Sequence, residues 1–228
     1  MSDNKNILRT RDGSQTLFVE SKSETYHSKH GALQESKYVY INKGLDYWWS
    51  CNPQATRCRV FEMGFGTGLN ALLAARYALT STHDIYFESV ENDPLPLSTH
   101  QALGLFNHFD DLGDGTILLD SLTEKWNTPH QWFPNFRLYK NQIDYFQWHA
   151  SHTFDIIFYD AFGAHAQGEM WEIDALQRAV ACLDLGGVWV SYCAKGSVRR
   201  NLKSLGLEVA RLPGPPGKRE MLRAIKVE

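Results

Sequence analysis

The segment Glu62-Met-Gly-Phe-Gly-Thr-Gly68 is the first feature of this sequence that could support binding chemistry. Glycines at a strand-to-helix turn permit a tight bend and let a ligand approach the backbone closely. A dinucleotide fingerprint requires glycine at the sixth position of Gly-x-Gly-x-x-Gly, where this sequence has Leu69, and no Gly-x-x-x-x-Gly-Lys-Ser/Thr phosphate loop occurs. The spacing of Gly64, Gly66 and Gly68 after an acidic residue instead predicts a loop for S-adenosylmethionine.

Two carboxylates further along the chain could complete such a site. Glu91 ends the next strand pattern, 27 residues after Gly64, where a carboxylate can accept hydrogen bonds from both ribose hydroxyls. A nicotinamide cofactor could use the same group, so Glu91 indicates a ribose but does not distinguish a nicotinamide cofactor from S-adenosylmethionine. Asp144 follows the third main strand and could accept a hydrogen bond from an adenine amino group; an ordinary surface position is the alternative.

Asp160 ends the apolar run Phe154-Asp-Ile-Ile-Phe-Tyr-Asp160, and open parallel sheets bind ligands at the carboxyl ends of their strands. Methyl transfer from a sulfonium is an in-line displacement that needs a free lone pair, held close and collinear with the leaving sulfur. An amine acceptor is largely protonated in water, and a carboxylate could orient it and take its proton. We therefore predict that Asp160 is catalytic; a turn or helix cap is the alternative.

Aromatic residues near these segments could stack on a nucleobase, and a base from a single-stranded loop is easier to insert than one from a duplex. Phe162 and Trp171 flank the predicted catalytic loop and are the preferred candidates, with Tyr26 and His27 as further ones. Core packing is the alternative for each of them.

Charge and composition limit the class of protein. The net charge is −3, but the segment 195–228 holds nine Lys/Arg against three Asp/Glu. A basic tail on an acidic body could meet a phosphate backbone, or it could be an ordinary solvated surface. No apolar run has the roughly 20 residues of a membrane helix, and Met1–Ser14 lacks the apolar stretch of a signal peptide, so we expect a cytoplasmic protein that does not contact membranes. The four cysteines lack metal-ligand spacing and indicate reduced thiols without a metal site.

Strand-like and helix-like patterns alternate from Arg59 to Leu205, which predicts a mostly parallel sheet with helices on both faces. Two final strand patterns with no helix between them predict an antiparallel hairpin, an ordering that class I methyltransferases show. The expected strands are 59–63, 84–91, 136–139, 154–160, 188–193, 207–210 and 220–227, and the expected helices are 67–79, 95–105, 172–183 and 197–205.

The N-terminal region has a different pattern. Gln15-Thr-Leu-Phe-Val19 and Tyr38-Val-Tyr-Ile41 are rich in β-branched and aromatic residues and predict short strands. We therefore expect a β-rich extension over residues 1–56 and a Rossmann-like methyltransferase domain over 57–228. Residues 107–134 predict loops and short helices.

Several spaced motifs give the sequence a family resemblance, which runs from about Asp12 to Ala224. It resembles the MnmD-type tRNA methyltransferases, which form 5-methylaminomethyl-2-thiouridine at the wobble position, alone or as the N-terminal half of bifunctional MnmC. The motifs are Tyr26-His-Ser28, Phe65-Gly-Thr-Gly-Leu-Asn70, Ser89-Val-Glu91, Tyr159-Asp-Ala-Phe162, Met170-Trp171, Tyr192-Cys-Ala-Lys-Gly196, Val198-Arg-Arg200 and Lys218-Arg-Glu-Met-Leu222.

The resemblance implies N-methylation of 5-aminomethyl-2-thiouridine in a tRNA anticodon loop, with S-adenosylmethionine as cofactor. The resemblance implies that the cofactor is bound by the glycine turn and the carboxylates near it, and that Asp160 contacts the reactive amine. The predicted cofactor residues are Glu62, Gly64, Phe65, Gly66, Thr67, Gly68, Asn70, Glu91, Asp144 and Asp160. The implied substrate residues are Tyr26, His27, Phe162, Trp171, Lys195, Arg199, Arg200, Lys218 and Arg219.

Two departures from the family pattern shape these expectations. The chain ends at Glu228 with no room for the oxidoreductase half of MnmC, so we expect no flavin. The loop Gly163-Ala-His-Ala-Gln-Gly-Glu169 lacks the prolines and the lysine that family members usually carry, which makes the acceptor less certain than the cofactor. A methyltransferase for another RNA position or a small amine, or a non-catalytic nucleotide-binding module, stay as alternatives.

Overall fold

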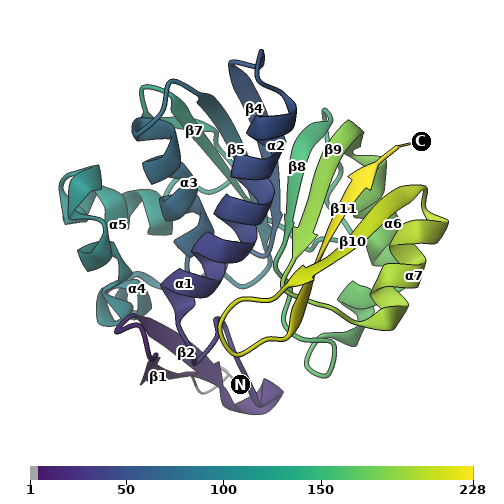
Figure 1. Ribbon diagram of the computed structural model, residues 1–228. Helices are drawn as coiled ribbons and strands as arrows, with labels where there is room; N and C mark the ends of the chain where they lie inside the picture. Colours follow the sequence, from purple (N-terminus) through teal and green to yellow (C-terminus); the bar gives the residue numbers. More distant parts are fainter. Residues whose placement is uncertain (1–4, 228) are drawn as a thin grey trace.

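The computed structural model describes residues 5–227, and an eight-stranded sheet runs through this part of the chain (Figure 1). The strands are β4 (Arg57–Met63), β5 (Asp84–Glu91), β6 (His130–Phe133), β7 (Phe136–Gln142), β8 (Phe154–Tyr159), β9 (Leu183–Ser191), β10 (Leu207–Pro213) and β11 (Glu220–Lys226). They lie in the order β10-β11-β9-β8-β4-β5-β7-β6. The five inner strands from β9 to β7 are parallel, β11 and β6 join them antiparallel at the two sides, and β10 pairs antiparallel with β11.

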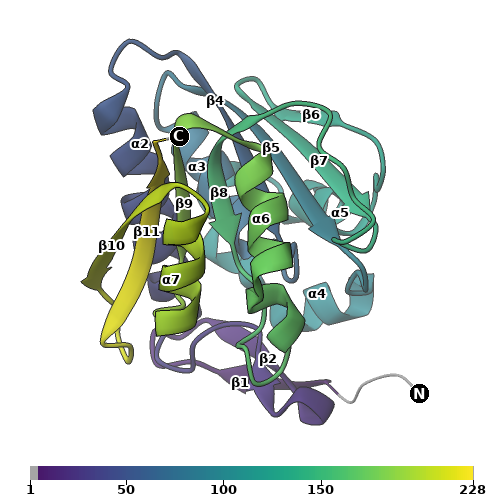
Figure 2. The same ribbon diagram turned by 90° about the vertical axis from the view of Figure 1, so that its right-hand side faces the viewer.

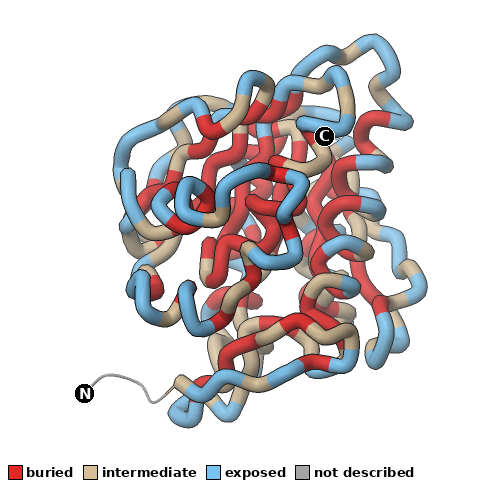
Figure 3. Tube along the Cα trace, turned by 90° about the vertical axis from the view of Figure 1, so that its left-hand side faces the viewer, coloured by how far each residue is buried: buried red, intermediate tan, exposed pale blue. Residues whose placement is uncertain are grey.

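Helices cover both faces of this sheet, as the alternating pattern predicted. One face packs against α3 (Leu69–Leu79) and a helical run made of α1 (Ala32–Ser36), η2 (Lys37–Leu45) and α2 (Asp46–Cys51). The other face packs against α6 (Ile173–Ala181) and α7 (Gly196–Ser204), which Figure 2 shows in front of β8 and β9. The inner strands are therefore buried on both sides, and buried residues fill the middle of the molecule (Figure 3).

Shorter elements connect the layers on the β5 and β7 side. They are α4 (Leu97–Leu103), η3 (Leu105–His108), η4 (Asp110–Leu112), α5 (Gly115–Thr123) and, before α6, η5 (Gly168–Trp171). The loops and short helices expected over 107–134 are thus present, together with the edge strand β6, which the sequence did not reveal.

A separate three-stranded antiparallel sheet of β1 (Lys5–Arg9), β2 (Gln15–Val19) and β3 (Glu24–Thr25) forms the start of the described chain. It lies at the end of the molecule toward which the parallel strands point (Figures 1 and 2). The expected strand at 15–19 and the small β-rich sheet are confirmed, and their position puts them over the carboxyl ends of the main strands.

The expected strand at Tyr38–Ile41 is wrong, because this segment lies inside η2. The β-branched and aromatic side chains of Val39, Tyr40 and Ile41 are buried against the sheet, so tertiary packing outweighs their strand propensity. Gly44 lets the helix approach closely: a Cβ there would lie 3.0 Å from the Phe158 ring and 3.1 Å from Val190. Residues 32–51 are consequently helical rather than β-rich.

The C-terminal hairpin is confirmed, since β10 and β11 pair antiparallel along their whole length. Strand β9 begins five residues earlier than expected and includes Gly186 and Gly187, because α6 ends at Ala181 and not at the glycines as predicted. All four cysteines are free thiols. Within residues 5–227 no helix is long and apolar enough to span a lipid bilayer.

Candidate functional site

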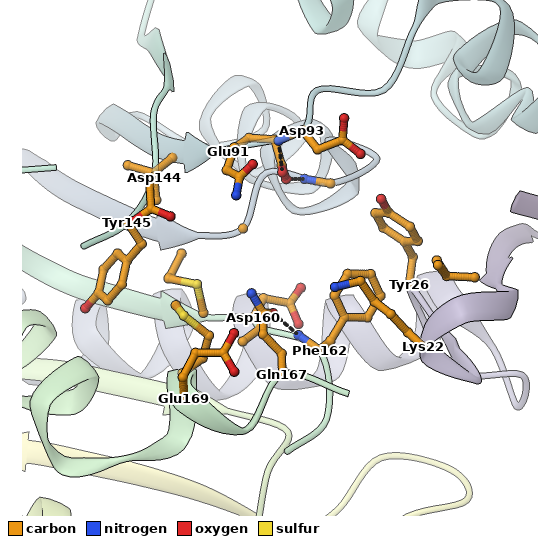
Figure 4. A pocket seen from close by; sticks show the side chains of 18 of the residues that line it. Lys22, Tyr26, Glu91, Asp93, Asp144, Tyr145, Asp160, Phe162, Gln167 and Glu169 are labelled. Atoms are coloured by element: carbon orange, nitrogen blue, oxygen red, sulfur yellow. Dashed lines mark hydrogen bonds between the residues drawn. The ribbon is translucent and has the colours of Figure 1, made fainter. Parts of the chain in front are cut away.

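A cavity of about 350 Å³ lies where β4, β5, β7 and β8 end, beneath the N-terminal sheet (Figure 4). The main sheet contributes Gly64, Gly66, Glu91, Asp93, Asp144, Asp160 and Phe162, and the N-terminal segment contributes Lys5, Lys22 and Tyr26. Residues that are far apart in the sequence thus meet at the carboxyl edge of a parallel sheet, the usual ligand position in such folds.

The glycine turn after β4 is held by the neighbouring strand. The backbone N–H groups of Gly64 and Phe65 both donate to the Val90 carbonyl, at 3.2 and 3.1 Å. Gly64 has φ +90°, and a Cβ there would lie 3.0 Å from the Asp160 carbonyl oxygen. The turn therefore requires glycine both for its left-handed backbone and for its close approach to the end of β8.

Glu91 lines the cavity and is fixed by backbone donors on both oxygens. The Gly66 N–H donates to Oε2 and the Asp93 N–H donates to Oε1, each at 2.9 Å (Figure 4). Burial raises the pKa of this carboxyl, while the backbone hydrogen bonds act in the opposite direction. The side chain is oriented before any ligand arrives, and each oxygen keeps a lone pair for a further donor.

Asp144 lies across the cavity from the glycine turn, after β7. Its Oδ1 accepts a hydrogen bond from the Phe146 N–H at 2.7 Å, which orients the carboxylate at the start of the loop that follows. This placement is compatible with the predicted contact to an adenine amino group.

Asp160 lies at the floor of the cavity and is held by two donors. The Tyr40 hydroxyl donates to Oδ1 at 2.6 Å, and the Asn70 amide donates to Oδ2 at 2.8 Å. Burial raises the pKa of the carboxyl to about 6, although both hydrogen bonds favour its ionised form. A carboxyl with this pKa is mostly ionised at neutral pH and remains able to accept a proton.

Five of the predicted cofactor residues do not line the cavity: Glu62, Phe65, Thr67, Gly68 and Asn70. Glu62 is fully buried and accepts a 2.8 Å hydrogen bond from the Ser89 hydroxyl, and burial raises its pKa well above the usual range. Asn70 contacts the cavity through Asp160. These residues form a layer behind the site that holds the turn and the carboxylate in place.

Among the predicted aromatic residues, Tyr26 and Phe162 line the cavity and contact each other edge to face at 4.9 Å. The Lys22 ammonium group lies over the Phe162 ring, 5.1 Å from its centroid. His27 is buried behind the turn, where its Nε2 pairs with the Thr67 hydroxyl at 2.7 Å, and burial lowers its pKa to about 4.

Trp171 is 3% exposed and lies outside the cavity lining. Its indole N–H donates to the Phe162 carbonyl at 2.7 Å. Trp171 therefore positions Phe162, and Phe162 is the ring that the structure presents to the cavity.

The predicted basic residues lie outside the cavity. Lys218 pairs with Glu35 at 2.6 Å and stands 3.6 Å from the centroid of Tyr192, a cavity residue, so the loop between β10 and β11 reaches the rim. Lys195, Arg200 and Arg219 are exposed, and Arg199 is half-buried. The structure brings Lys218 close to the site and leaves the other four on the surface around α7 and the hairpin.

Sequence reasoning missed Tyr40 and the cavity residues Lys5, Lys22, Gln167 and Glu169. Gln167 accepts a hydrogen bond from the Phe162 N–H at 3.3 Å and so shapes the loop after Asp160. The position of Gln167 and Glu169 in that loop was a usable signal. Tyr40 offered none, because it precedes Asp160 by 120 residues.

Comparison with known proteins agrees with this geometry. A family described as S-adenosyl-L-methionine-dependent methyltransferase matches residues 136–227. The "tRNA 5-methylaminomethyl-2-thiouridine biosynthesis bifunctional protein MnmC" of Acinetobacter baylyi is 28% identical over 220 residues, which cover 89% of this chain and 34% of that protein. The protein of the same name from Marinomonas sp. is 29% identical, over 87% of this chain and 30% of that protein.

A solved structure gives the same picture at the level of the fold. The crystal structure of MnmC2 from Aquifex aeolicus matches 100% of this chain and 72% of that chain, with a TM-score of 0.76 and 24% identity. The chain is thus similar to S-adenosyl-L-methionine-dependent methyltransferases over residues 136–227 and to MnmC proteins over most of its length. It spans about a third of the length of the curated relatives that it matches. The predicted fold class, cofactor and enzyme class are thereby confirmed.

Proposed function

We propose that the methyltransferase transfers a methyl group to the aminomethyl nitrogen of 5-aminomethyl-2-thiouridine at the wobble position of tRNA. The observation that carries the proposal is Asp160, a carboxylate held by Tyr40 and Asn70 at the floor of the cavity, beside the glycine turn. The relatives named for biosynthesis of this nucleoside support the choice of acceptor. A tRNA substrate also implies a cytoplasmic location.

The residues around the cavity fit S-adenosylmethionine, which supplies the methyl group as an activated sulfonium. Gly64 and Gly66 leave room for the methionine end against bare backbone, because a Cβ on either would crowd the Asp160 carbonyl or the Tyr26 ring. Glu91 would accept hydrogen bonds from the ribose hydroxyls, and Asp144 from the adenine amino group.

Asp160 would act on the acceptor amine. With one lone pair of each oxygen occupied by Tyr40 or Asn70, the remaining lone pairs can accept hydrogen bonds from the amine and orient its nitrogen. Asp160 would accept the proton that the amine nitrogen loses when it is methylated, either directly or through water. Its raised pKa suits this role, since it makes the carboxylate a better proton acceptor.

Phe162 and Tyr26 would receive the nucleobase. They form an aromatic pair in the cavity lining, and Lys22 beside Phe162 adds a positive charge that a phosphate of the anticodon loop could pair with. Lys195, Arg199, Arg200, Lys218 and Arg219 would contact the RNA backbone around this opening, and such contacts predict binding that weakens steeply with salt.

Mass spectrometry of nucleosides tests the proposal directly. Purified protein is incubated with S-adenosylmethionine and tRNA that carries 5-aminomethyl-2-thiouridine, with Asp160→Asn as the control. The expected result is a gain of one methyl group on that nucleoside with the wild type and a large loss with the variant. Methylation of small amines or another tRNA position, with none at the wobble base, would refute the acceptor. S-adenosylmethionine binding without transfer to any acceptor would refute the enzyme role.

A further inference from the structure

A second hollow, of about 370 Å³, lies on the main sheet at the amino ends of β4, β5 and β7. This is the end opposite the cofactor cavity, and the two hollows share no lining residue. Gln131, Pro134 and Asn135 of the β6–β7 hairpin form one side of it, and we call it the arginine groove after Arg57, Arg59 and Arg137.

The strand register places the groove residues in a row. Arg59 on β4 is paired with Tyr86 on β5, and Tyr86 is paired with Arg137 on β7. Gln131 on β6 extends the row as the partner of Arg137. Side chains of directly paired residues point to the same face of a sheet, and Arg57 shares this face because it lies two residues before Arg59.

In the described part of the chain, no helix covers the part of the face that carries this row (Figure 2), and the His152 ring contacts Tyr86 edge to face at 5.3 Å. Helices α6 and α7 lie in front of β8 and β9, and no helix stands in front of β6 and β7 in the same view (Figure 2). The three arginines are exposed, whereas Tyr86 between Arg59 and Arg137 is half-buried. Long charged side chains therefore surround a partly apolar floor.

Positive charge is in excess in the groove, since three arginines and one aspartate, Asp84, line it. A second carboxylate nearby, Asp155, accepts the backbone N–H of Arg59 at 2.7 Å. The guanidinium contacts are long: Arg59 reaches the Thr153 carbonyl at 3.4 Å and Arg137 reaches Gln131 at 3.5 Å. None of the three arginines forms a salt bridge within residues 5–227, so most of their donors have no protein partner.

We propose that the arginine groove binds phosphate groups, with one phosphate at the Arg59 fork and a second at the Arg137 fork. Neighbouring strands lie about 4.8 Å apart, so the two arginines start about 10 Å apart and can hold two groups of one ligand. The planar guanidinium group can donate two parallel hydrogen bonds to two oxygens of one phosphate. A lysine ammonium group carries the same charge but cannot form this bidentate contact. The shared ligand chemistry is a pair of phosphate groups, from a free diphosphate or from an RNA backbone.

Calorimetric titration with inorganic pyrophosphate tests the groove on the full chain, with S-adenosylhomocysteine present at saturation to fill the cofactor cavity. We expect saturable binding by the wild type, at least about tenfold weaker binding by Arg59→Ala/Arg137→Ala, and little change in Lys203→Ala/Arg211→Ala, which removes two exposed charges elsewhere. No saturable binding by the wild type at millimolar pyrophosphate, or equal weakening by both double variants, would overturn the proposal.

Two further arms complete the experiment. Thermal unfolding checks that the variants fold. The variant Arg59→Lys/Arg137→Lys keeps the charge and removes the guanidinium fork, so it should bind pyrophosphate with intermediate affinity. Wild-type affinity in this variant would contradict the fork geometry. Filter binding with tRNA then distinguishes the source. A drop in tRNA affinity for Arg59→Ala/Arg137→Ala beyond that of the control pair assigns the groove to RNA, and equal tRNA affinities assign it to a free diphosphate.

Discussion

The two walls of the cofactor cavity are anchored in different ways. The glycine turn at Gly64–Gly68 is fixed by backbone hydrogen bonds to Val90, by Glu91, and by the buried pair of Thr67 and His27. The loop after β8 is fixed at its ends, where the Tyr192 hydroxyl donates to the Ala161 carbonyl and Trp171 donates to Phe162. Its middle is held by hydrogen bonds within the loop, from the Ala166 and Gln167 N–H groups to the Gly163 carbonyl and from the Phe162 N–H to Gln167. It is tied to the N-terminal sheet by His165, which pairs with Glu24 at 3.3 Å and is 62% exposed.

This difference separates the binding of the cofactor from that of the acceptor. The contacts of the glycine turn are buried and closely packed, so the turn has only one conformation available. The cofactor wall therefore has its final shape before S-adenosylmethionine binds. The middle of the other wall has hydrogen bonds within the loop, and the ion pair that ties it to the N-terminal sheet contributes only about 0–1 kcal/mol, so this segment can shift as a unit at little cost. Under the proposed function, we infer that the wall formed by this loop adapts to the incoming nucleoside while the cofactor wall stays fixed.

Asp160, where the two walls meet, should give the largest effect. Asp160→Ala should lower turnover by at least about 10²-fold, because the proposed mechanism assigns to this carboxylate the orientation of the amine and the acceptance of its proton. The affinity for S-adenosylmethionine should stay nearly unchanged. Single-turnover methyl transfer and calorimetry measure the two quantities separately, and near-normal turnover would reject the assignment.

Gly64→Ala should give the next largest effect, and it acts on the fixed wall. The added Cβ meets the Asp160 carbonyl at 3.0 Å and forces a side chain into a left-handed backbone, which costs about 1–2 kcal/mol by itself. We expect at least about tenfold weaker S-adenosylmethionine binding, equivalent to about 1.4 kcal/mol, by calorimetry.

Gly186→Ala is the matched control for this substitution. Gly186 has φ +76° and nothing lies within 4 Å of an added Cβ, so the variant carries the backbone strain alone. It should lower the free energy of unfolding and leave cofactor affinity unchanged. Equal cofactor affinities in the Gly64 and Gly186 variants would contradict a rigid cofactor wall.

Tyr40→Phe should have a smaller, pH-dependent effect. The variant removes the hydroxyl that donates to Asp160 and favours its ionised form, so the pKa of the carboxyl should rise above about 6. In the proposed mechanism the ionised form accepts the proton, so turnover should fall as pH drops through this pKa, and the acid limb of the profile should move upward by roughly half to one pH unit in the variant.

The pH profile of kcat measures this shift. Tyr38→Phe is the control, because Tyr38 lies on the same helix and donates to the Pro213 carbonyl instead. A profile that coincides with the wild type in Tyr40→Phe would show that Asp160 does not set the acid limb.

Glu24→Gln should have the smallest effect, and it acts on the adaptable wall. It removes the carboxylate that pairs with His165, a contact that is partly exposed on both sides. We expect a change of about twofold to threefold in KM for the RNA, diminishing with salt, and no change in S-adenosylmethionine affinity. A tenfold loss of cofactor affinity would show that the two walls are coupled.

Much of the fold follows from local patterns. Strand β5 was predicted with its observed bounds, and β4, β8 and α3 within two residues, because apolar periodicity and glycine stops act over short segments. The position of Glu91 and Asp160 at the cavity could be predicted because each stands at or just after the end of a buried strand, and the carboxyl ends of parallel strands share one edge.

The exceptions arise from long-range contacts. Tyr38–Ile41 has a strand-like composition and is helical, because burying Tyr40 against the sheet outweighs its local preference. Tyr40 and Lys22 join the cavity from the N-terminal region, and no spacing rule connects them to Asp160.

The sequence by itself determined the alternation of strands and helices, the glycine turn and the carboxylates at the strand ends. These features depend on residue types that are close together in the chain. Only the tertiary structure decided which of the predicted side chains face the cavity, what holds Asp160, and that Arg59 and Arg137 stand in one row at the far end of the sheet. Those outcomes depend on strand order and register, which are set by packing between segments that are distant in the chain.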